Sequence, residues 1–150
     1  MKIKLKTMKK TIVTLLFIVI TVMTFSQTKT AEIYRCSSLG FSTLDEKTGK
    51  WSEYEMKESN IIIKNNLIKN EITIGGGEKD IIIYLLRKTA SDSKVDKDGD
   101  KYTIMLFDAY DQDARDCEWV KIDYPDYTNI NFVIVYNNLK VYMECNIINN

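Results

Sequence analysis

The chain of 150 residues contains no histidine. Histidine is the side chain most often used as a general base near neutral pH, and it is the commonest nitrogen ligand of metals. It is also the central member of the Ser-His-Asp and Cys-His catalytic arrangements. We therefore expect no catalytic residues and no cofactor, and the sequence favours a protein that is not an enzyme.

Cysteine and proline are scarce, with three cysteines and one proline in the whole chain. In an exported protein, three cysteines allow one disulfide and one free thiol, far fewer than a disulfide framework needs. Two interpretations stay open: no disulfide, or a Cys36–Cys145 disulfide if the first and last strands are neighbours. No cysteine stands at the end of the N-terminal apolar segment, which argues against a lipid-attached N-terminus.

The first 26 residues form a segment of their own. Five lysines precede an apolar run from Ile12 to Phe25, interrupted only by threonines. At the end of this run, the small residues Thr24 and Ser26 have the spacing of a cleavage site that follows Ser26. These are the features of a secretory signal peptide. The run gives about 21 Å of helix, too short for a hydrocarbon core of about 30 Å. We expect residues 1–26 to be a signal peptide and the remainder to work in the periplasm or outside the cell.

Removal of this leader, whether it starts at Met1 or Met8, changes the net charge. The whole chain is neutral, with 21 basic and 21 acidic residues, but all five charges of the leader are lysines. The mature chain, residues 27–150, therefore carries 16 basic and 21 acidic residues, a net charge of −5. Nucleic acids and anionic membranes bind positive surfaces. We expect no nucleic-acid binding and no stable insertion of the mature chain into a membrane.

The mature chain has the pattern of strands and turns throughout. No segment after the leader has a helical period. Short reversals between consecutive segments predict one all-β domain over residues 27–150, an up-and-down antiparallel sheet of eight or nine strands. So many strands usually hide their edges in a barrel or a barrel-like sandwich. The expected strands are Ala31–Leu44 with a bend near Gly40, Trp51–Met56, Asn60–Lys64, Leu67–Ile74, Asp80–Arg87, Lys101–Asp108, Glu118–Tyr124, Ile130–Tyr136 and Leu139–Ile147.

Asparagine and glycine mark the expected reversals. Asn65-Asn66 and Asn137-Asn138 are predicted to be two-residue turns, because asparagine tolerates a positive φ. The Gly75–Gly77 triplet lets the chain reverse, and Thr89–Asp100 is expected to be a polar loop. Between these two segments, the continuous apolar block Ile81–Leu86 predicts a strand that is buried on both faces or at an oligomer contact.

Two acidic segments are candidate sites. In the first, Asp96, Asp98 and Asp100 surround Gly99 in a way that resembles part of a calcium-binding loop. The bidentate acid that closes such a loop is missing, and the segment continues into a strand instead of a helix. The pattern therefore predicts a solvated turn, with weak metal binding by the three aspartates as the alternative.

The second acidic segment holds Asp108, Asp111, Asp113 and Asp116. A charged loop that keeps neighbouring strand edges soluble is the simpler interpretation, and weak binding of a hard cation by these carboxylates is an alternative. Clustered carboxylates also supply the acid and base of glycoside hydrolysis. A hydrolase that acts on glycan or peptide through these loop aspartates is therefore kept as an alternative. Such a hydrolase would have two carboxylates about 5–10 Å apart in a cleft.

Aromatic residues are plentiful, with two tryptophans and nine tyrosines. Their rings combine an apolar body with a polar tip, which suits either a barrel interior or a binding surface. We expect most tyrosines to belong to the core. Trp51, Trp119, Tyr124 and Tyr127 are the candidates for an exposed platform that stacks on sugars or peptides.

Three segments carry a resemblance to known proteins. The chain resembles a loose group of small exported β-rich proteins of Bacteroidota in its leader and in the segments Lys50–Tyr54, Lys101–Ile104 and Val120–Tyr124. This resemblance implies export and a β fold but no activity. The motif Gly49-Lys50-Trp51 is similar to the Gly-x-Trp motif of lipocalins, although no flanking helix is evident. This second resemblance implies a lipocalin-like architecture.

The observations together favour an exported, non-enzymatic, small β-barrel protein that serves as a binding or envelope accessory protein. Its partner would be a small ligand, a glycan or an envelope protein. The bulky residues expected to point inward predict a filled interior. A pocket of roughly several hundred Å³ lined by apolar residues would instead favour a carrier of a small apolar ligand.

Overall fold

A computed structural model describes residues 29–125 and 128–148. The expected signal peptide, residues 1–26, and Tyr127 lie outside these residues. Within the described residues every regular element is a β-strand, and no helix is long and apolar enough to cross a membrane. The strands are β1 (Ala31–Asp45), β2 (Lys50–Trp51), β3 (Glu55–Asn66), β4 (Glu71–Gly75), β5 (Ile81–Val95), β6 (Lys101–Asp111), β7 (Asp116–Asp123), β8 (Asn129–Val135) and β9 (Leu139–Ile147).

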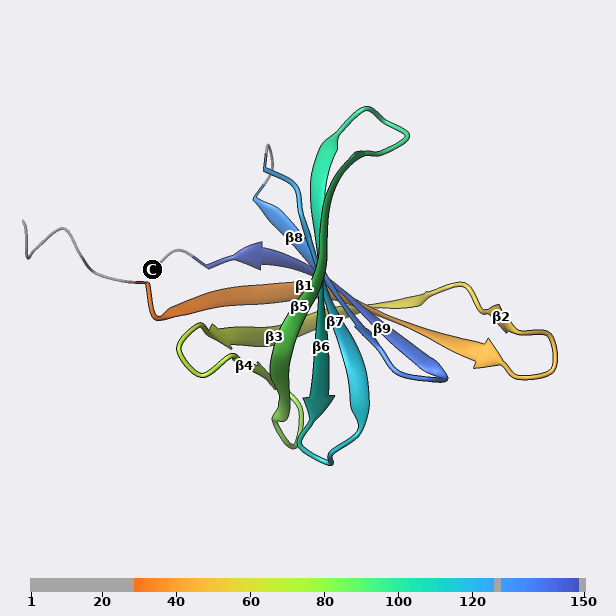
Figure 1. Ribbon diagram of the computed structural model, residues 1–150, viewed down its shortest axis with the longest axis horizontal. Helices are drawn as coiled ribbons and strands as arrows, with labels where there is room; N and C mark the ends of the chain where they lie inside the picture. Colours follow the sequence, from red (N-terminus) through yellow and green to blue (C-terminus); the bar gives the residue numbers. More distant parts are fainter. Residues whose placement is uncertain (1–28, 126–127, 149–150) are drawn as a thin grey trace, which may run out of the picture.

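The nine described strands form one antiparallel sheet, which the pairing of β1 with β9 closes into a ring. Figure 1 labels the strands, which fan out from a common centre in that view. Neighbours follow the chain order from β3 to β9, and β1 pairs with β3 on one side and with β9 on the other. The two-residue β2 lies outside the ring, on the end of β1. The expected all-β, up-and-down antiparallel fold is confirmed, and the closed ring is barrel-like. Closure leaves few strand edges free.

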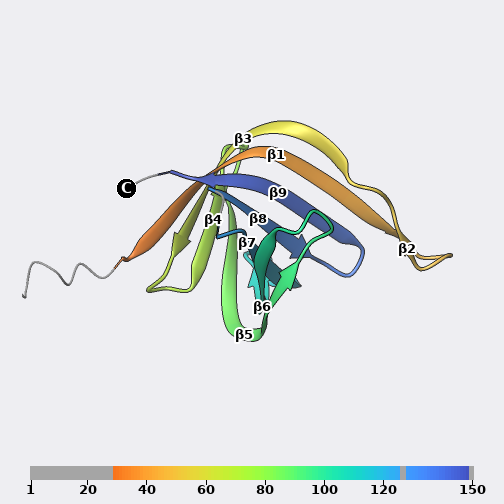
Figure 2. The ribbon, with the colours of Figure 1, turned by 90° about the horizontal axis from the view of Figure 1, so that it is seen from above.

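The first hairpin is longer and simpler than the sequence predicts. Figure 2 shows β1 and β3 extending together towards β2. The separate strands expected at Trp51–Met56 and Asn60–Lys64 are wrong, because residues 55–66 pair with β1 as a single strand. The pairing shifts register between Cys36 and Ser38.

The turn between β3 and β4 begins two residues later than predicted. Asn65 and Asn66 are not a turn, since both pair with β1 and β4. The four residues after them make the reversal, and the last, Asn70, has a φ of 52°. The Asn66 side chain accepts hydrogen bonds from the backbone N–H groups of Ile68 and Lys69, both at 3.1 Å. Asn66 therefore stabilises the turn from the end of the strand.

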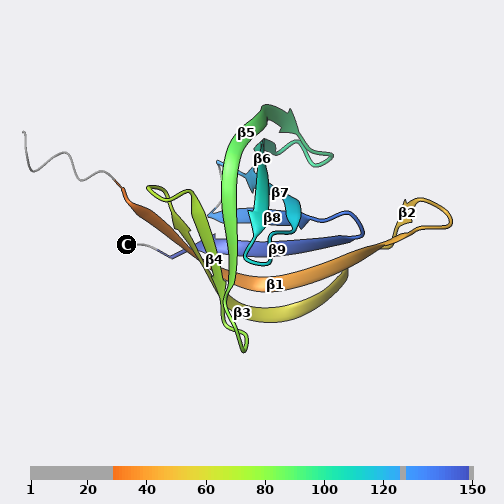
Figure 3. The same ribbon diagram turned by 60° about the horizontal axis from the view of Figure 1, so that its bottom comes forward.

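The loop expected at Thr89–Asp100 is also wrong. β5 continues to Val95 and pairs with β6 along its length, with two register shifts, so only residues 96–100 form the turn. Figure 3 shows β5 and β6 rising away from β1 and β3, beyond the short β4. All side chains from Leu86 to Val95 are exposed, so this part of β5 has solvent on both faces.

Burial in the apolar block at the start of β5 is greatest at Ile83 and falls towards both ends. Ile83 is fully buried, whereas Ile81 and Leu86 are exposed, Leu86 by 62%. The prediction that Ile81–Leu86 is buried on both faces is therefore wrong. The block contacts the core at Ile83, and its two ends, Ile81 and Leu86, meet solvent.

Inward-facing side chains fill the middle of the ring. Trp119 is 2% exposed and lies against Phe132, with ring centroids 4.9 Å apart. Tyr34 contacts the same Phe132 edge-on at 5.0 Å. Isoleucines from β3, β4 and β5 complete this core, in which Ile63, Ile72 and Ile83 are fully buried.

Candidate functional site

A hollow of about 540 Å³ lies beside the turns that join β6 to β7 and β8 to β9. Most of its lining is apolar, and we call it the apolar pocket. Its apolar and aromatic lining residues are Leu39, Phe41, Ile61, Ile74, Ile81, Ile134, Tyr136, Leu139, Val141 and Met143, and its polar ones are Arg115, Asp116, Asn137 and Asn138.

Strand pairing at the closure of the ring builds one wall of the pocket. On β1 and β9, Leu39 lies opposite Met143, and Phe41 lies opposite Val141. Residues two apart on a strand share a face, so these four side chains form two inward rows. Met143 is buried, while Phe41 is 38% exposed. This wall of the pocket therefore extends from the buried core at Met143 to the protein surface at Phe41.

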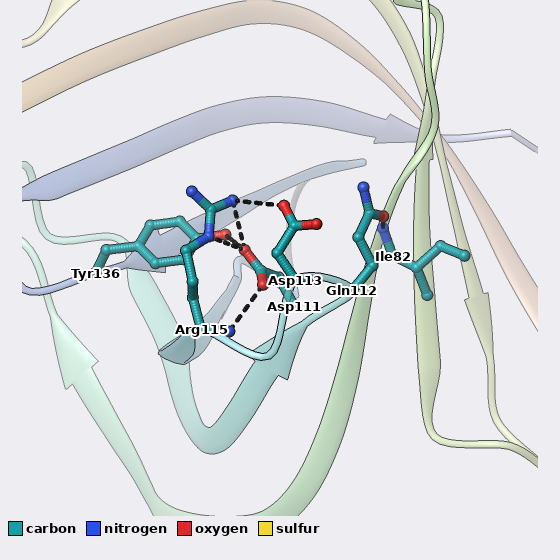
Figure 4. Close-up of polar contacts among 6 residues, drawn as sticks. All are labelled: Ile82, Asp111, Gln112, Asp113, Arg115 and Tyr136. Carbon is teal, nitrogen blue, oxygen red and sulfur yellow. Dashed lines mark hydrogen bonds and ion pairs between the residues drawn. The ribbon is translucent and has the colours of Figure 1, made fainter.

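Asp111, at the end of β6, anchors the polar side of the pocket (Figure 4). Its side chain is 1% exposed. Oδ2 accepts hydrogen bonds from Arg115 Nε at 2.7 Å and from the Tyr136 hydroxyl at 3.1 Å. Oδ1 accepts from the backbone N–H groups of Asp113 and Arg115, both at 3.0 Å. Both carboxylate oxygens thus have donors, which a buried charge requires.

The β6–β7 turn is shaped around this carboxylate. The backbone N–H of Ala114 donates to the Asp111 carbonyl at 2.9 Å, and Ala114 has a φ of 60°. Gln112 fixes the turn to β5, because its Oε1 accepts from the Ile82 N–H at 2.6 Å and its own N–H donates to the Ile82 carbonyl at 3.0 Å. These contacts hold Arg115 at the pocket.

The positive charge of Arg115 is balanced locally. Its Nη2 lies 2.7 Å from the Asp111 carboxylate and 3.4 Å from that of Asp113. The guanidinium also lies over the Tyr136 ring, 5.3 Å from its centroid. Asp116 adds another negative charge to the lining. The polar side of the pocket therefore has no excess positive charge with which to attract an anion.

The same contacts fix the protonation states of this cluster. Burial alone would raise the pKa of Asp111, but hydrogen bonds from Arg115, Asp113 and Tyr136 outweigh it and lower the pKa. Burial, and then the charge of Asp111, raises the pKa of the Tyr136 hydroxyl. Near neutral pH the pair is a carboxylate and a phenol. Asp111 is therefore poorly suited to act as a general acid.

The aromatic platform predicted from the sequence is not assembled. Trp119 is a core residue, because β7 turns it inward against Phe132, so its prediction as an exposed residue is wrong. Trp51 lies on β2, where the Lys140 ammonium is 4.1 Å from its ring centroid. Tyr124 is half-buried after β7, and Tyr127 lies outside the described residues.

The first acidic segment, residues 96–100, forms a tight turn. The Asp96 carboxylate accepts hydrogen bonds from the backbone N–H groups of Asp98 and Asp100, at 2.9 and 3.0 Å. Gly99 has a φ of 91°. In the described residues, no group of three or more acidic or cysteine side chains is arranged to hold a metal ion. The three aspartates thus make a solvated turn.

The second acidic segment is divided between the two faces of the sheet. Asp111 points inward to Arg115, whereas Asp108 pairs with the exposed Arg87 through a 2.7 Å contact. Asp113 shares Arg115 with Asp111. Each of these three carboxylates has a cationic partner, which is the pattern of structural ion pairs.

The cysteines are three buried thiols, with no disulfide among the described residues. Cys36 and Cys145 nevertheless lie directly opposite each other on β1 and β9. The first and last strands are therefore neighbours, as the disulfide interpretation requires. The disulfide itself stays a prediction.

Sequence reasoning missed the residues of the apolar pocket. The alternation of Leu39 and Phe41 and of Leu139, Val141 and Met143 was a detectable signal of two inward rows. The sequence alone did not show that β1 pairs with β9, which brings these rows together. It also did not show that Asp111 binds the Arg115 side chain.

The sequence matches no protein-family model, and no curated protein or solved structure matches it. The fold and the pocket therefore define the class of this protein: an all-β, barrel-like protein with an apolar pocket. The resemblances to exported proteins of Bacteroidota and to lipocalins stay predictions.

Proposed function

We propose that this protein is an exported carrier of a small, largely apolar ligand, which it binds in the apolar pocket within a lipocalin-like barrel. The observation that carries the proposal is the apolar lining of a hollow of about 540 Å³. Ligand pockets generally have about 300–1,000 Å³ and an apolar lining with a few polar groups. Side chains fill the middle of the ring, as expected, but the hollow lies beside them at the β6–β7 and β8–β9 turns. A ring without such a hollow would have favoured an accessory protein that binds no small ligand.

The polar side of the pocket indicates the chemistry of the ligand. Arg115 is neutralised by Asp111 and Asp113, and Asp116 adds a negative charge. The side-chain amides of Asn137 and Asn138 supply neutral donors and acceptors. The ligand is therefore an uncharged molecule with one polar end, and fatty-acid anions are disfavoured. The negative net charge of the mature chain also supports a partner other than nucleic acid or an anionic membrane.

The hydrolase alternative has less support. Asp111 is held as a carboxylate by Arg115 and Tyr136, and Asp108 pairs with Arg87 on the other face of β6. Glycoside hydrolysis needs an acid and a base that face the same bond. The geometry of these carboxylates therefore favours binding over hydrolysis as the function of this protein.

Binding of the neutral apolar dye N-phenyl-1-naphthylamine tests the proposal. Val141→Trp places a large ring in the pocket wall and should abolish the rise in dye fluorescence. Ile68→Trp adds the same ring at an exposed turn position, away from the pocket lining, and should leave binding unchanged. Palmitate should displace the dye less well than hexadecanol. Equal binding by both variants, or no dye binding by the wild-type protein, would exclude the pocket as the site.

A further inference from the structure

A second hollow, of about 440 Å³, lies on the outer face of the ring. None of its lining residues belongs to the apolar pocket. On β8 and β9, Ile130, Phe132 and Met143 are buried in the core and do not line this hollow. Since side chains alternate along a strand, the residues between them point to the other face. We call this hollow the outer polar pocket.

Four polar side chains form its floor in two facing pairs. Asn129 lies opposite Asn146, and Asn131 lies opposite Glu144. All four line the hollow. Together they present three side-chain amides and one carboxylate. Amides both donate and accept hydrogen bonds, whereas the carboxylate accepts only.

One tyrosine, Tyr124, lines the hollow beside this floor, and other tyrosines lie near it. Tyr124 lines the hollow and lies 5.4 Å from Tyr102, centroid to centroid. On β9, Tyr142 shares the outer face with Glu144 and lies 5.4 Å from Tyr54. Burial raises the pKa of Tyr124, and burial together with the charge of Glu144 raises that of Tyr142 to about 12. The phenols thus remain protonated near neutral pH, with an apolar ring and a polar tip.

The charge of the hollow restricts what it can bind. Asp96, Asp100 and Glu144 line it, and none of the described residues in its lining is basic. Anionic ligands are therefore disfavoured. A metal ion is disfavoured too, because the described residues contain no suitable group of three or more ligating side chains.

We propose that the outer polar pocket binds a neutral oligosaccharide. Asn131 and Glu144, with the Asn129–Asn146 pair beside them, bind neighbouring sugar hydroxyls, and the ring of Tyr124 stacks on the apolar C–H face of a sugar. Sugar hydroxyls carry no charge and both donate and accept hydrogen bonds. The three amides of this floor can do both as well, and the Glu144 carboxylate can accept. The site is independent of the apolar pocket, and a ligand in one leaves the other open.

Titration calorimetry with a panel of neutral hexasaccharides tests this proposal. The probes are hexamers of β-linked glucose, α-linked glucose, mannose and N-acetylglucosamine, with hexagalacturonate as the anionic comparison. At least one neutral hexamer should bind with a dissociation constant below about 1 mM. Asn131→Ala and Tyr124→Ala should each weaken that binding about tenfold, the effect of one or two net hydrogen bonds or contacts. Tyr124→Phe should retain most of it, because the ring remains.

Asn60→Ala is the matched control, since Asn60 is exposed on β3 and lines neither hollow. Thermal melting verifies that each variant is folded, and the exposed Glu144→Ala serves as a replacement if Tyr124→Ala does not fold. Asn131→Ala should leave binding of the apolar dye unchanged, which separates this site from the proposed carrier function. The proposal is wrong if no neutral hexamer binds or if hexagalacturonate binds more tightly than every neutral hexamer. It is also wrong if Asn131→Ala and Tyr124→Ala (or its replacement Glu144→Ala) bind the hexamer as well as Asn60→Ala does.

Discussion

Cys36 and Cys145 face each other across the pairing of β1 with β9, where the ring closes. Both side chains are buried, with exposures of 0% and 1%. A hydrogen bond from the Cys145 thiol lowers the pKa of Cys36. The same contact, together with burial, raises the pKa of Cys145. Cys36 is thus the better nucleophile of the two, because the thiolate is the reactive form.

In a buffer of oxidised glutathione, we expect one intramolecular disulfide between these two cysteines. The Cys36 thiolate attacks a glutathione disulfide and releases one glutathione thiolate, and Cys145 then displaces the second glutathione. Because the bond closes a long loop, it should raise the free energy of unfolding by about 2–4 kcal/mol. Peptide mapping by mass spectrometry identifies the linked peptides. Cys117→Ser should still form the bond and Cys145→Ser should not; a linkage that involves Cys117 would contradict the strand register.

Asp111 should make the protein sensitive to acid. Its pKa is lowered in the folded state, so its ionised form contributes stability above its ordinary pKa of about 4, and that contribution is lost as the pH falls through the folded-state value. Asp111→Asn should therefore lose less stability than the wild type between about pH 7 and about pH 3. Urea unfolding at the two pH values measures the difference.

Asp113→Asn is the control for this pH dependence, because the Asp113 side chain is exposed and makes only the longer, 3.4 Å contact with Arg115. Its loss of stability in acid should match that of the wild type. A residual acid sensitivity is expected in Asp111→Asn, since the pKa of Glu32 is also lowered, by Tyr34, Lys121 and Asn65 against the opposing effect of burial. Identical pH profiles for the wild type and Asp111→Asn would show that the carboxylate is not held as described.

The two tryptophans should behave differently. Trp119→Ala removes a buried ring that contacts Phe132 and should lower the free energy of unfolding by about 3–5 kcal/mol. Trp51→Ala loses a partly exposed contact with Lys140 and should cost about 0.5–1 kcal/mol. In Trp51→Phe, all tryptophan fluorescence comes from Trp119. It should be blue-shifted and resistant to acrylamide quenching; a quencher-accessible signal would place Trp119 at the surface.

The sequence predicted the strands wherever local pattern and tertiary pairing agree. The strand Leu139–Ile147 and the position of the turn at Asn137-Asn138 were correct, because the turn residues and the alternating strand indicate the same hairpin. The reason given for the turn was wrong, since neither asparagine has a positive φ. The loop predicted at Thr89–Asp100 was wrong because a strand that is polar and exposed on both faces resembles a loop in composition. Only its pairing with β6 makes it a strand.

The candidate site depended on pairings that no single segment encodes. Trp119 and Val120 are adjacent and both buried, so the pattern of β7 alone did not show which of its faces turns inward. Asp111 and Asp108 looked equivalent in the acidic segment, yet their side chains lie on opposite faces of β6. The distinction comes from the bond of Asp111 to Tyr136, a residue 25 positions away.

The glycines of the β4–β5 turn offer a test that joins local backbone conformation to the pocket. Gly76 has a φ of 121°, and a Cβ there would lie 3.2 Å from the Ile61 Cα, whereas at Gly77 the nearest atom would be 3.8 Å away. Gly76→Ala should therefore cost about 1–3 kcal/mol, and Gly77→Ala should be neutral or stabilise slightly, because it restricts the unfolded chain. Ile61, Ile74 and Ile81 line the apolar pocket on both sides of this turn. Gly76→Ala should thus also weaken dye binding, while Gly77→Ala should not; equal melting temperatures for the two variants would mean that the turn has another conformation.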